Sequence, residues 1–322
     1  TFFGKAKETL SMLKQSRREF LVGSAAGMVA AQSWVMALGA EEQPAQMTIA
    51  KWSGSKELSA EQLKEVAEKL TERAIEGLGG MKRFVKPGDV VWVKPNIAWD
   101  RRPEYAANTN PDIVAKIVRM CLDAGAKVVK MGDYPVNVAQ KTYESSGIAA
   151  AARAAGARVV FLDRSRFKNM AIGGERLKEH PVYPEMVECD VLINVPIVKH
   201  HVLATATLCM KNFMGVVDAR QVFHQALPPC LCDITRFMMP RTRLSLLDAV
   251  RILKAHGPRG GNLEDVETKL TVAAGTDMVA LDAWGAEVMG RKPEDIGSIV
   301  LGHKVGLGKM DYRSVAREIA VS

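Results

Sequence analysis

The sequence predicts an α/β protein of three layers, in which a mostly parallel central sheet carries helices on both faces. Short runs of β-branched and aliphatic residues alternate with amphipathic segments of helical length. Glycine or proline stands at many of the junctions between them. A strand, helix, strand order of this kind is typical of parallel crossovers, which need helices on the faces of the sheet.

The individual elements follow from local signals. Ser59 and Gln62 have the spacing of a capping box, which predicts a helix that ends at the glycines of 77–80. Later helices are expected where Pro111 follows an N-cap residue and where Gly156 ends an alanine-rich run. The remaining elements are a strand at 90–93, a helix from 109–112 to 122, strands at 127–131, 158–162, 191–195 and 270–274, and helices at 143–155 and 277–289.

The first forty residues predict an export signal of the twin-arginine type. Arg17 and Arg18 lie in a basic stretch that precedes residues 20–40, which contain no charged side chain. Small residues at 37–40 suggest cleavage there, and an uncleaved segment would instead anchor the chain in a membrane. We therefore expect a protein that the twin-arginine translocase exports folded to the periplasm, with a signal at 1–40, a polar leader and covering helix at 41–84, and an α/β domain at 85–322.

Composition excludes some classes of function. The formal net charge is +8, part of which lies in the first forty residues, and this surplus is too small to indicate a nucleic-acid partner. The five cysteines include no C-x-x-C pair, so the chain has no self-contained iron–sulfur motif. Cys230 and Cys232 could meet a metal, or they could lie in an ordinary loop or helix start.

Polar residues follow three of the predicted strands and are expected to meet at one edge of the sheet. In open α/β sheets the ligand crevice lies outside the carboxyl ends of the strands. Lys94 and Asn96 follow one strand, Asp133 the next, and Lys199 to His201 a third. With Lys211, two of these lysines would form a cationic pocket suited to a carboxylate or phosphate, and a desolvated lysine could act as a base or Schiff-base amine.

Catalytic and binding roles are expected within this group. Three of the six histidines lie between 200 and 224, and the neighbours His200 and His201 cannot point the same way in a regular element. His201 could join His224 in binding a divalent metal or in moving protons, or both histidines could have only structural roles. The candidate catalytic residues are Lys199, His201, Lys211 and Asp133, and the candidate substrate-binding residues are Lys94, Asn96, Thr109, Thr207 and Asn212.

The order of six motifs resembles the domain-of-unknown-function family 362. The motifs are a K-P-N strand end, a T-N-P helix start, an A-G-A-K-V strand entry, a P-x-x-K-x-H element, a T-L-x-x-K-N-x-x-G segment and a late G-T-D-x-x-A-x-D helix. They cover the chain from about residue 85 to its end. Some similar proteins are fused to ferredoxin-type domains, which implies an association with redox proteins.

Two classes of function remain open. One is a periplasmic enzyme, with or without a metal, that acts on a small anionic substrate through the lysines and histidines above. The alternative is a non-catalytic subunit or assembly partner of an exported redox complex. Export in a folded state suits both, because it allows a cofactor or partner to be added before transit.

Overall fold

The computed structural model of the protein describes residues 45–322. The predicted export signal and the beginning of the predicted leader lie outside these residues. Within residues 45–322 no helix has both the length and the apolar character that a bilayer span requires.

The secondary structure follows the predicted alternation. The strands are β1 (Met47–Trp52), β2 (Val90–Pro95), β3 (Val128–Met131), β4 (Arg158–Val159), β5 (Lys168–Ala171), β6 (Glu179–Val182), β7 (Val191–Val195), β8 (Ile197–His201), β9 (Thr205–Thr207), β10 (Thr242–Leu253), β11 (Val266–Gly275) and β12 (Ala316–Val321). The α-helices are α2 (Ala60–Glu76), α3 (Pro111–Asp123), α4 (Ala139–Ser145), α5 (Ile148–Ala154), α6 (Pro184–Glu188), α7 (Cys209–Asn212), α8 (Gln221–Gln225), α9 (Leu227–Met238), α10 (Met278–Val288) and α11 (Gly297–Lys304).

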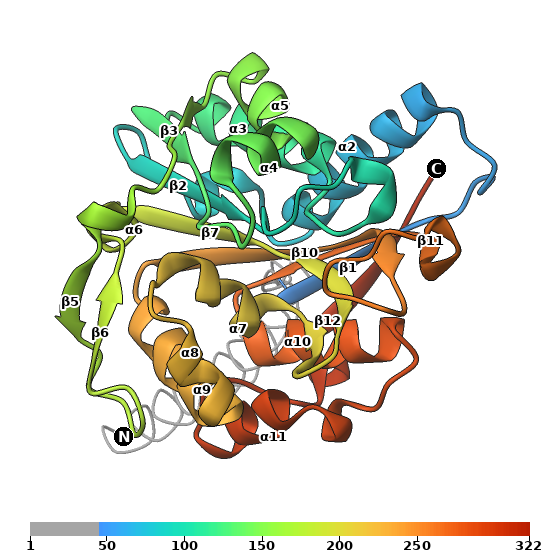
Figure 1. The fold of residues 1–322 in the computed structure, drawn as a ribbon. Helices are drawn as coiled ribbons and strands as arrows, with labels where there is room; N and C mark the ends of the chain where they lie inside the picture. Colours follow the sequence, from blue (N-terminus) through green and yellow to red (C-terminus); the bar gives the residue numbers. More distant parts are fainter. Residues whose placement is uncertain (1–44) are drawn as a thin grey trace, which may run out of the picture. The chain divides into compact units, whose positions relative to one another are not determined.

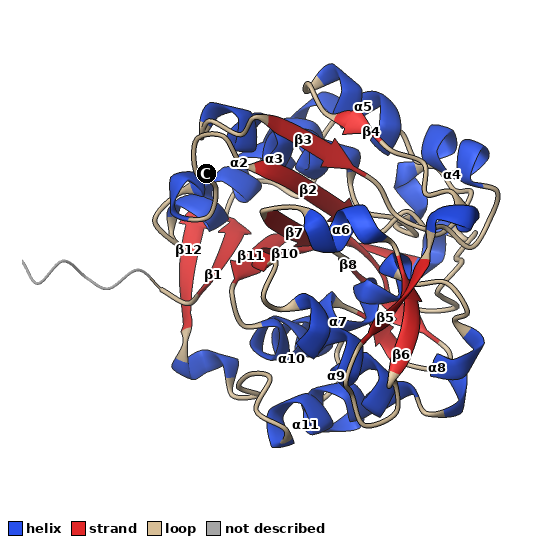
Figure 2. Ribbon diagram, turned by 90° about the vertical axis from the view of Figure 1, so that its left-hand side faces the viewer, coloured by secondary structure: helices blue, strands red, loops and turns tan. Residues whose placement is uncertain are grey.

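A ten-stranded, mostly parallel sheet forms the centre of the fold (Figures 1 and 2). Eight strands lie in the order β12-β1-β11-β10-β7-β2-β3-β4, and β8 pairs with both β10 and β9. Among the described strands of this sheet, β11 and β9 run against their neighbours and the others run in one direction. The carboxyl ends of β2, β3 and β8 are therefore directed toward the same edge.

Helices cover both faces of this sheet, as predicted. Figure 1 shows α2 to α5 on one side of the sheet and α7 to α11 on the other. Side chains of β2 alternate between the layers: Val91 and Val93 pack with α2, α3 and α5, whereas Trp92 packs in the core formed with α7, α9 and α10. The sheet is thus the middle of three layers, with a buried core on each face.

Local capping fixes two of the predicted helices. Ser59 accepts a hydrogen bond from the backbone N–H of Gln62, whose side chain accepts from the Ser59 N–H, so the capping box of α2 is present. Asn110 caps α3 through the N–H of Asp112.

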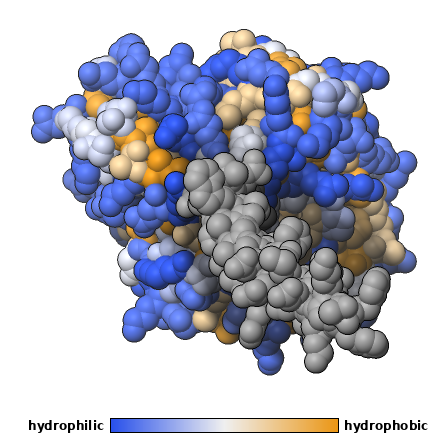
Figure 3. All heavy atoms as spheres, turned by 180° about the vertical axis from the view of Figure 1, so that it is seen from behind, coloured by the Kyte–Doolittle hydropathy of each residue, from blue (hydrophilic) through white to orange (hydrophobic). Residues whose placement is uncertain are grey.

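Away from the core the surface is polar: Figure 3, which views the molecule from behind, shows a mainly hydrophilic face with smaller hydrophobic areas.

Several elements differ from the prediction: β5, β6, β8, β9, β10 and β12 and the helices α6 to α9 and α11 were not predicted, and three further differences have a structural cause. The leader contains an unpredicted strand, β1, whose first four residues are buried where it pairs with β11 and β12. The helix expected at 143–155 is divided into α4 and α5, because Gly147 adopts a left-handed conformation with φ +70°. The strand expected at 158–162 is reduced to Arg158–Val159, since it lies at the edge of the sheet and pairs with β3 over two residues.

Candidate functional site

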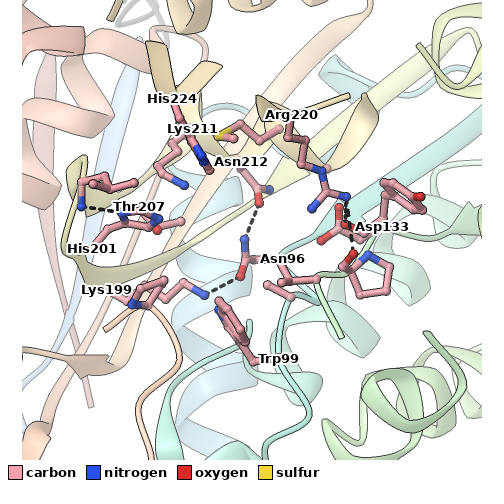
Figure 4. Close-up of a pocket in the computed structure, with 18 of the residues that line it drawn as sticks. Asn96, Trp99, Asp133, Lys199, His201, Thr207, Lys211, Asn212, Arg220 and His224 are labelled. Atoms are coloured by element: carbon pink, nitrogen blue, oxygen red, sulfur yellow. Dashed lines mark hydrogen bonds between the residues drawn. The ribbon is translucent and has the colours of Figure 1, made fainter. Parts of the chain in front are cut away.

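A cavity of about 580 Å³ lies where the predicted strand ends converge. Its walls come from the segments after β2 and β3, from β8 and β9, and from α7 and α8. Figure 4 shows the polar side chains of these elements directed toward one another. Most of the predicted site residues line it, namely Asn96, Asp133, Lys199, His201, Thr207, Lys211, Asn212 and His224. Lys94 and Thr109 do not.

Lys94 forms a buried ion pair with Asp133 next to the cavity. Its Nζ lies 2.7 Å from Asp133 Oδ1 and also donates to the Pro95 carbonyl, and neither charged residue is more than 2% exposed. Asp133 Oδ2 accepts a hydrogen bond from the Ile97 backbone N–H at 2.7 Å. Burial lowers the pKa of Lys94, against the opposing effect of the Asp133 carboxylate. Lys94, predicted to bind substrate, instead holds and neutralises Asp133.

A chain of amide side chains connects Lys199 to the centre of the sheet. Lys199 Nζ donates to Asn96 Oδ1 at 2.8 Å, and the Asn96 amide donates to Asn212 Oδ1 at 2.9 Å. The Asn212 amide donates in turn to Asn194 Oδ1 at 2.8 Å, and Asn194 donates to the Cys209 carbonyl. Because each nitrogen in this chain donates to a defined acceptor, the amide orientations and the position of the Lys199 amine are set together.

Thr109 supports this chain from outside the cavity. Its hydroxyl accepts from the Asn96 backbone N–H at 2.9 Å and donates to the Val195 carbonyl at 2.7 Å. The hydroxyl thus both donates and accepts a hydrogen bond within the protein, and the residue is 1% exposed. Thr109, predicted to bind substrate, therefore positions Asn96.

The two cavity lysines differ in their surroundings. Lys199 is 1% exposed and donates to Asn96 and to the Ala107 carbonyl. Burial and the neighbouring Lys211 hold the pKa of Lys199 well below its ordinary range, which favours the uncharged amine. Lys211 is half-buried and, among the described residues, its Nζ has no hydrogen-bond or ion-pair partner. Burial and Arg220 lower the pKa of Lys211 to about 8, so it carries a charge at neutral pH.

Arg220 is a further cation in the cavity wall, outside the residues predicted from the sequence. Its guanidinium donates to the Tyr134 carbonyl at 2.6 Å and lies over the Tyr134 ring at 4.5 Å from the ring centroid. No carboxylate in the described part of the chain forms an ion pair with it. No motif marks this position in the sequence, since Arg220 reaches the cavity from the segment between η4 (Phe213–Val216) and α8.

His201 is arranged as a hydrogen-bond donor to the cavity. Its Nδ1 accepts from the backbone N–H groups of Leu203 and Ala204, both at 3.2 Å. Burial and the nearby lysines lower the pKa of the ring to about 3, so the neutral ring carries its proton on Nε2. An Nε2 that carries the proton cannot ligate a metal, and residues 45–322 contain no group of three or more His, Cys, Asp or Glu that could hold one. This arrangement does not favour a metal between His201 and His224.

Three buried or helix-capping aspartates near these elements accept hydrogen bonds from backbone N–H groups. Asp277 is the N-cap of α10 and accepts from the Ala280 N–H. Asp282 accepts from the Cys209 and Met210 N–H groups at the start of α7, and Asp248, inside β10, accepts from Asn110 and Val250 N–H. None of the three lines the cavity.

The five cysteines are buried and free, and their burial raises the thiol pKa values, which disfavours the reactive thiolate. Cys230 and Cys232 lie within α9, where the metal role considered above has no third ligand among the described residues.

Comparison with known proteins finds a family whose match includes the residues of this cavity, and a relative. The model of a domain of unknown function, DUF362, matches residues 91–287. A thylakoid-associated protein from Synechocystis sp. is 30% identical over 244 residues, which are 72% of this chain and 73% of that protein.

Two solved structures are distantly similar. The lactate racemase apoprotein from Thermoanaerobacterium thermosaccharolyticum has a TM-score of 0.45 and 12% identity, and a protein from Thermotoga maritima has a TM-score of 0.39 and 14% identity. Each similarity covers 78% of this chain, which spans 58% of the first structure and 60% of the second.

Proposed function

The chain belongs to the DUF362 family, and from this premise we propose that it is an enzyme acting on a small anionic substrate in the cavity described above. The observation that carries the proposal is that two cations in the cavity wall have no ion-pair partner among the described residues. Asp133 is paired with Lys94, and Asp218, which also lines the cavity, is paired with Arg164 at 2.8 Å. Lys211 and Arg220 have no such partner among the described residues. A bound carboxylate or phosphate would form ion pairs with both cations.

Hydrogen-bond donors near these cations lack an acceptor within the protein, as expected of a binding site. Thr207 lines the cavity, is 3% exposed, and its hydroxyl has no hydrogen-bond partner. An unpartnered buried hydroxyl costs about 1–3 kcal/mol, which a bound acceptor would recover. The Nε2–H of His201 is a second donor in the same wall. We assign Lys211 and Arg220 to the anion, and Thr207 and His201 to its neighbouring oxygen atoms.

The two lysines are suited to different steps. Environments that separate the pKa values of two titratable groups in one cavity are typical of acid and base pairs. Lys199, whose pKa burial lowers, is the base or nucleophile, whereas Lys211 stays protonated and holds the substrate anion. Asp133 is a positioning residue in this scheme, because both of its carboxylate oxygens accept hydrogen bonds from the protein.

The proposal is tested with a panel of small carboxylates and phosphates in a thermal-shift assay. A panel member that raises the Tm of the wild type should lose this effect in Lys211→Met, while Lys304→Met, an exposed lysine on α11, should behave as the wild type. If Lys199 is a base that removes a proton from the carbon next to the anionic group, Lys199→Met should keep the Tm shift but lose deuterium exchange at that carbon, measured by mass spectrometry in D₂O. Equal Tm shifts in Lys211→Met and wild type would contradict the proposal.

We further propose that the protein reaches the periplasm folded, through the twin-arginine translocase. The support is the pair Arg17 and Arg18 ahead of an uncharged segment, which lies outside the described residues. The compact core on both faces of the sheet suits a route that carries folded proteins.

A further inference from the structure

The cavity has two chemically different parts. Its inner wall is polar and cationic, with Lys199, Lys211 and Arg220. Its exposed lining includes the apolar side chains of Val136, Val202 and Leu203, beside the polar residues Gln221 and His224. A site for a small polar anion would need only the first part, so the second part requires a separate explanation.

Three apolar residues of the cavity lining are unusually exposed. Val202 is 74% exposed, Leu203 65% and Val136 56%. Val202 and Leu203 lie in the turn between β8 and β9, where polar and turn-forming residues are usual. Exposed hydrophobic side chains that gather at a concave surface commonly mark a binding site. We call Val136, Val202 and Leu203 the apolar rim.

The turn that carries Val202 and Leu203, two residues of the apolar rim, is held by a residue of the cavity wall. The N–H groups of Leu203 and Ala204 both donate to His201 Nδ1, so the turn is tied to a residue of the inner wall. A ligand that contacts the inner wall therefore meets a rim that is already ordered, which lowers the entropic cost of binding.

From this arrangement we propose that the substrate is an amphiphilic anion, in which a carboxylate or phosphate head binds at Lys211 and Arg220 and an alkyl body lies on the apolar rim. The inference rests on the proposed function and adds the class of substrate. Each buried methylene contributes about 0.8 kcal/mol, which corresponds to about a fourfold gain in affinity. Affinity should therefore rise with chain length until the body extends beyond the rim.

The test is calorimetric titration of the protein with acetate, butyrate, hexanoate and octanoate, and with the alkyl phosphates of the same lengths. We expect Kd to fall about fourfold per methylene in at least one of the two series, and the series that binds identifies the head group. Leu203→Ser and Val202→Ser should flatten the dependence on chain length and leave the Kd of the shortest anion unchanged. Val300→Ser, at an exposed valine of α11 away from the cavity, is the matched control.

Other outcomes separate the two proposals. If anions bind through Lys211 with no dependence of Kd on chain length, the inference of an amphiphilic substrate is overturned and the proposed function stands. If the alkyl alcohols bind as tightly as the anions and Lys211→Met has no effect, the anionic substrate itself is overturned. If Leu203→Ser or Val202→Ser lowers co-sedimentation with phosphatidylglycerol vesicles but leaves the chain-length dependence of Kd unchanged, the apolar rim is a membrane contact. The amphiphilic-substrate inference would then fail. Absence of binding by every member would overturn both proposals.

Discussion

Lys94 Nζ lies 2.7 Å from Asp133 Oδ1, and this pair determines the charge of the neighbouring cavity. The two residues come from the ends of adjacent parallel strands, β2 and β3. Because Asp133 is paired with Lys94, neither Lys211 nor Arg220 forms an ion pair among the described residues, although the Asp133 and Asp218 carboxylates also attract Arg220. The same pair is a structural element, since it also binds the backbone of Pro95 and Ile97.

Asp133→Asn should destabilise the protein by about 3–5 kcal/mol, because it leaves the Lys94 ammonium buried without its partner. The measurement is urea unfolding followed by circular dichroism. Glu76→Gln, which removes the exposed pair of Arg73 and Glu76, is the control and should change the free energy of unfolding by less than about 1 kcal/mol. A loss of similar size in both variants would show that the buried pair has no special role.

Gly215→Ala should disrupt the same pair by sterics. A Cβ atom at this position would lie 1.8 Å from Asp133 Oδ1 and 2.7 Å from Lys94 Nζ, so η4 could not keep its approach to the two residues. We expect a loss of about 1–3 kcal/mol in the free energy of unfolding, together with weaker anion binding. Gly297→Ala, whose nearest neighbour would be Pro228 Cγ at 3.0 Å, is the comparison and should retain anion binding.

Anion binding should depend on pH through Lys211. Its pKa lies near 8 in the folded protein, and only the protonated amine attracts the anion. The affinity for an anion that stays ionised should therefore be constant below about pH 7 and fall as the pH rises through 8, by up to about tenfold per pH unit. Titrations between pH 6 and 10 measure it. Lys211→Met should bind weakly without this pH dependence, and a wild-type affinity that stays constant to pH 10 would refute the role.

The stability of the protein should depend on pH through Asp282. Burial raises the pKa of this carboxyl to about 7, although the N–H groups of Cys209 and Met210 oppose the shift. The folded state therefore binds more protons than the unfolded state between about pH 4 and 7, so this contribution to stability is present below pH 4 and is lost as the pH rises through 7. The slope is at most about 1.4 kcal/mol per pH unit.

Asp282→Asn removes that titration and should give a shallower decline of the unfolding free energy between pH 5 and 7. Asp248, whose pKa burial raises to about 6, contributes in the same direction and remains in the variant. Identical slopes in the variant and in the wild type would show that Asp282 does not titrate in this range.

Export should depend on the two arginines near the N-terminus. The double variant Arg17→Lys with Arg18→Lys keeps the charge but removes the twin-arginine signature, so we expect the precursor to remain in the cytoplasm. Fractionation of cells that express a C-terminally tagged chain measures the distribution. Lys14→Arg is the control, and unchanged periplasmic accumulation of the double variant would contradict the proposed route.

Several parts of the fold could be predicted from the sequence because their causes are local. The capping box of Ser59 and Gln62 and the cap of Asn110 depend on residues three or fewer positions apart. The burial of Val91 and Val93 follows from a continuous apolar run. The unpredicted strand β1 had no such signal, since its burial depends on β11 and β12 from the far end of the chain.

The sequence by itself determined the alternation of strands and helices, and with it the edge of the sheet where the polar strand ends meet. Only the tertiary structure decided what each polar group does there. Lys94 and Lys211 are chemically identical, but one is paired with an aspartate 39 positions away and the other faces the cavity without a partner among the described residues. The charge of a lysine, the tautomer of His201 and the presence of Arg220 depend on burial and on neighbours distant in sequence, and no local pattern encodes them.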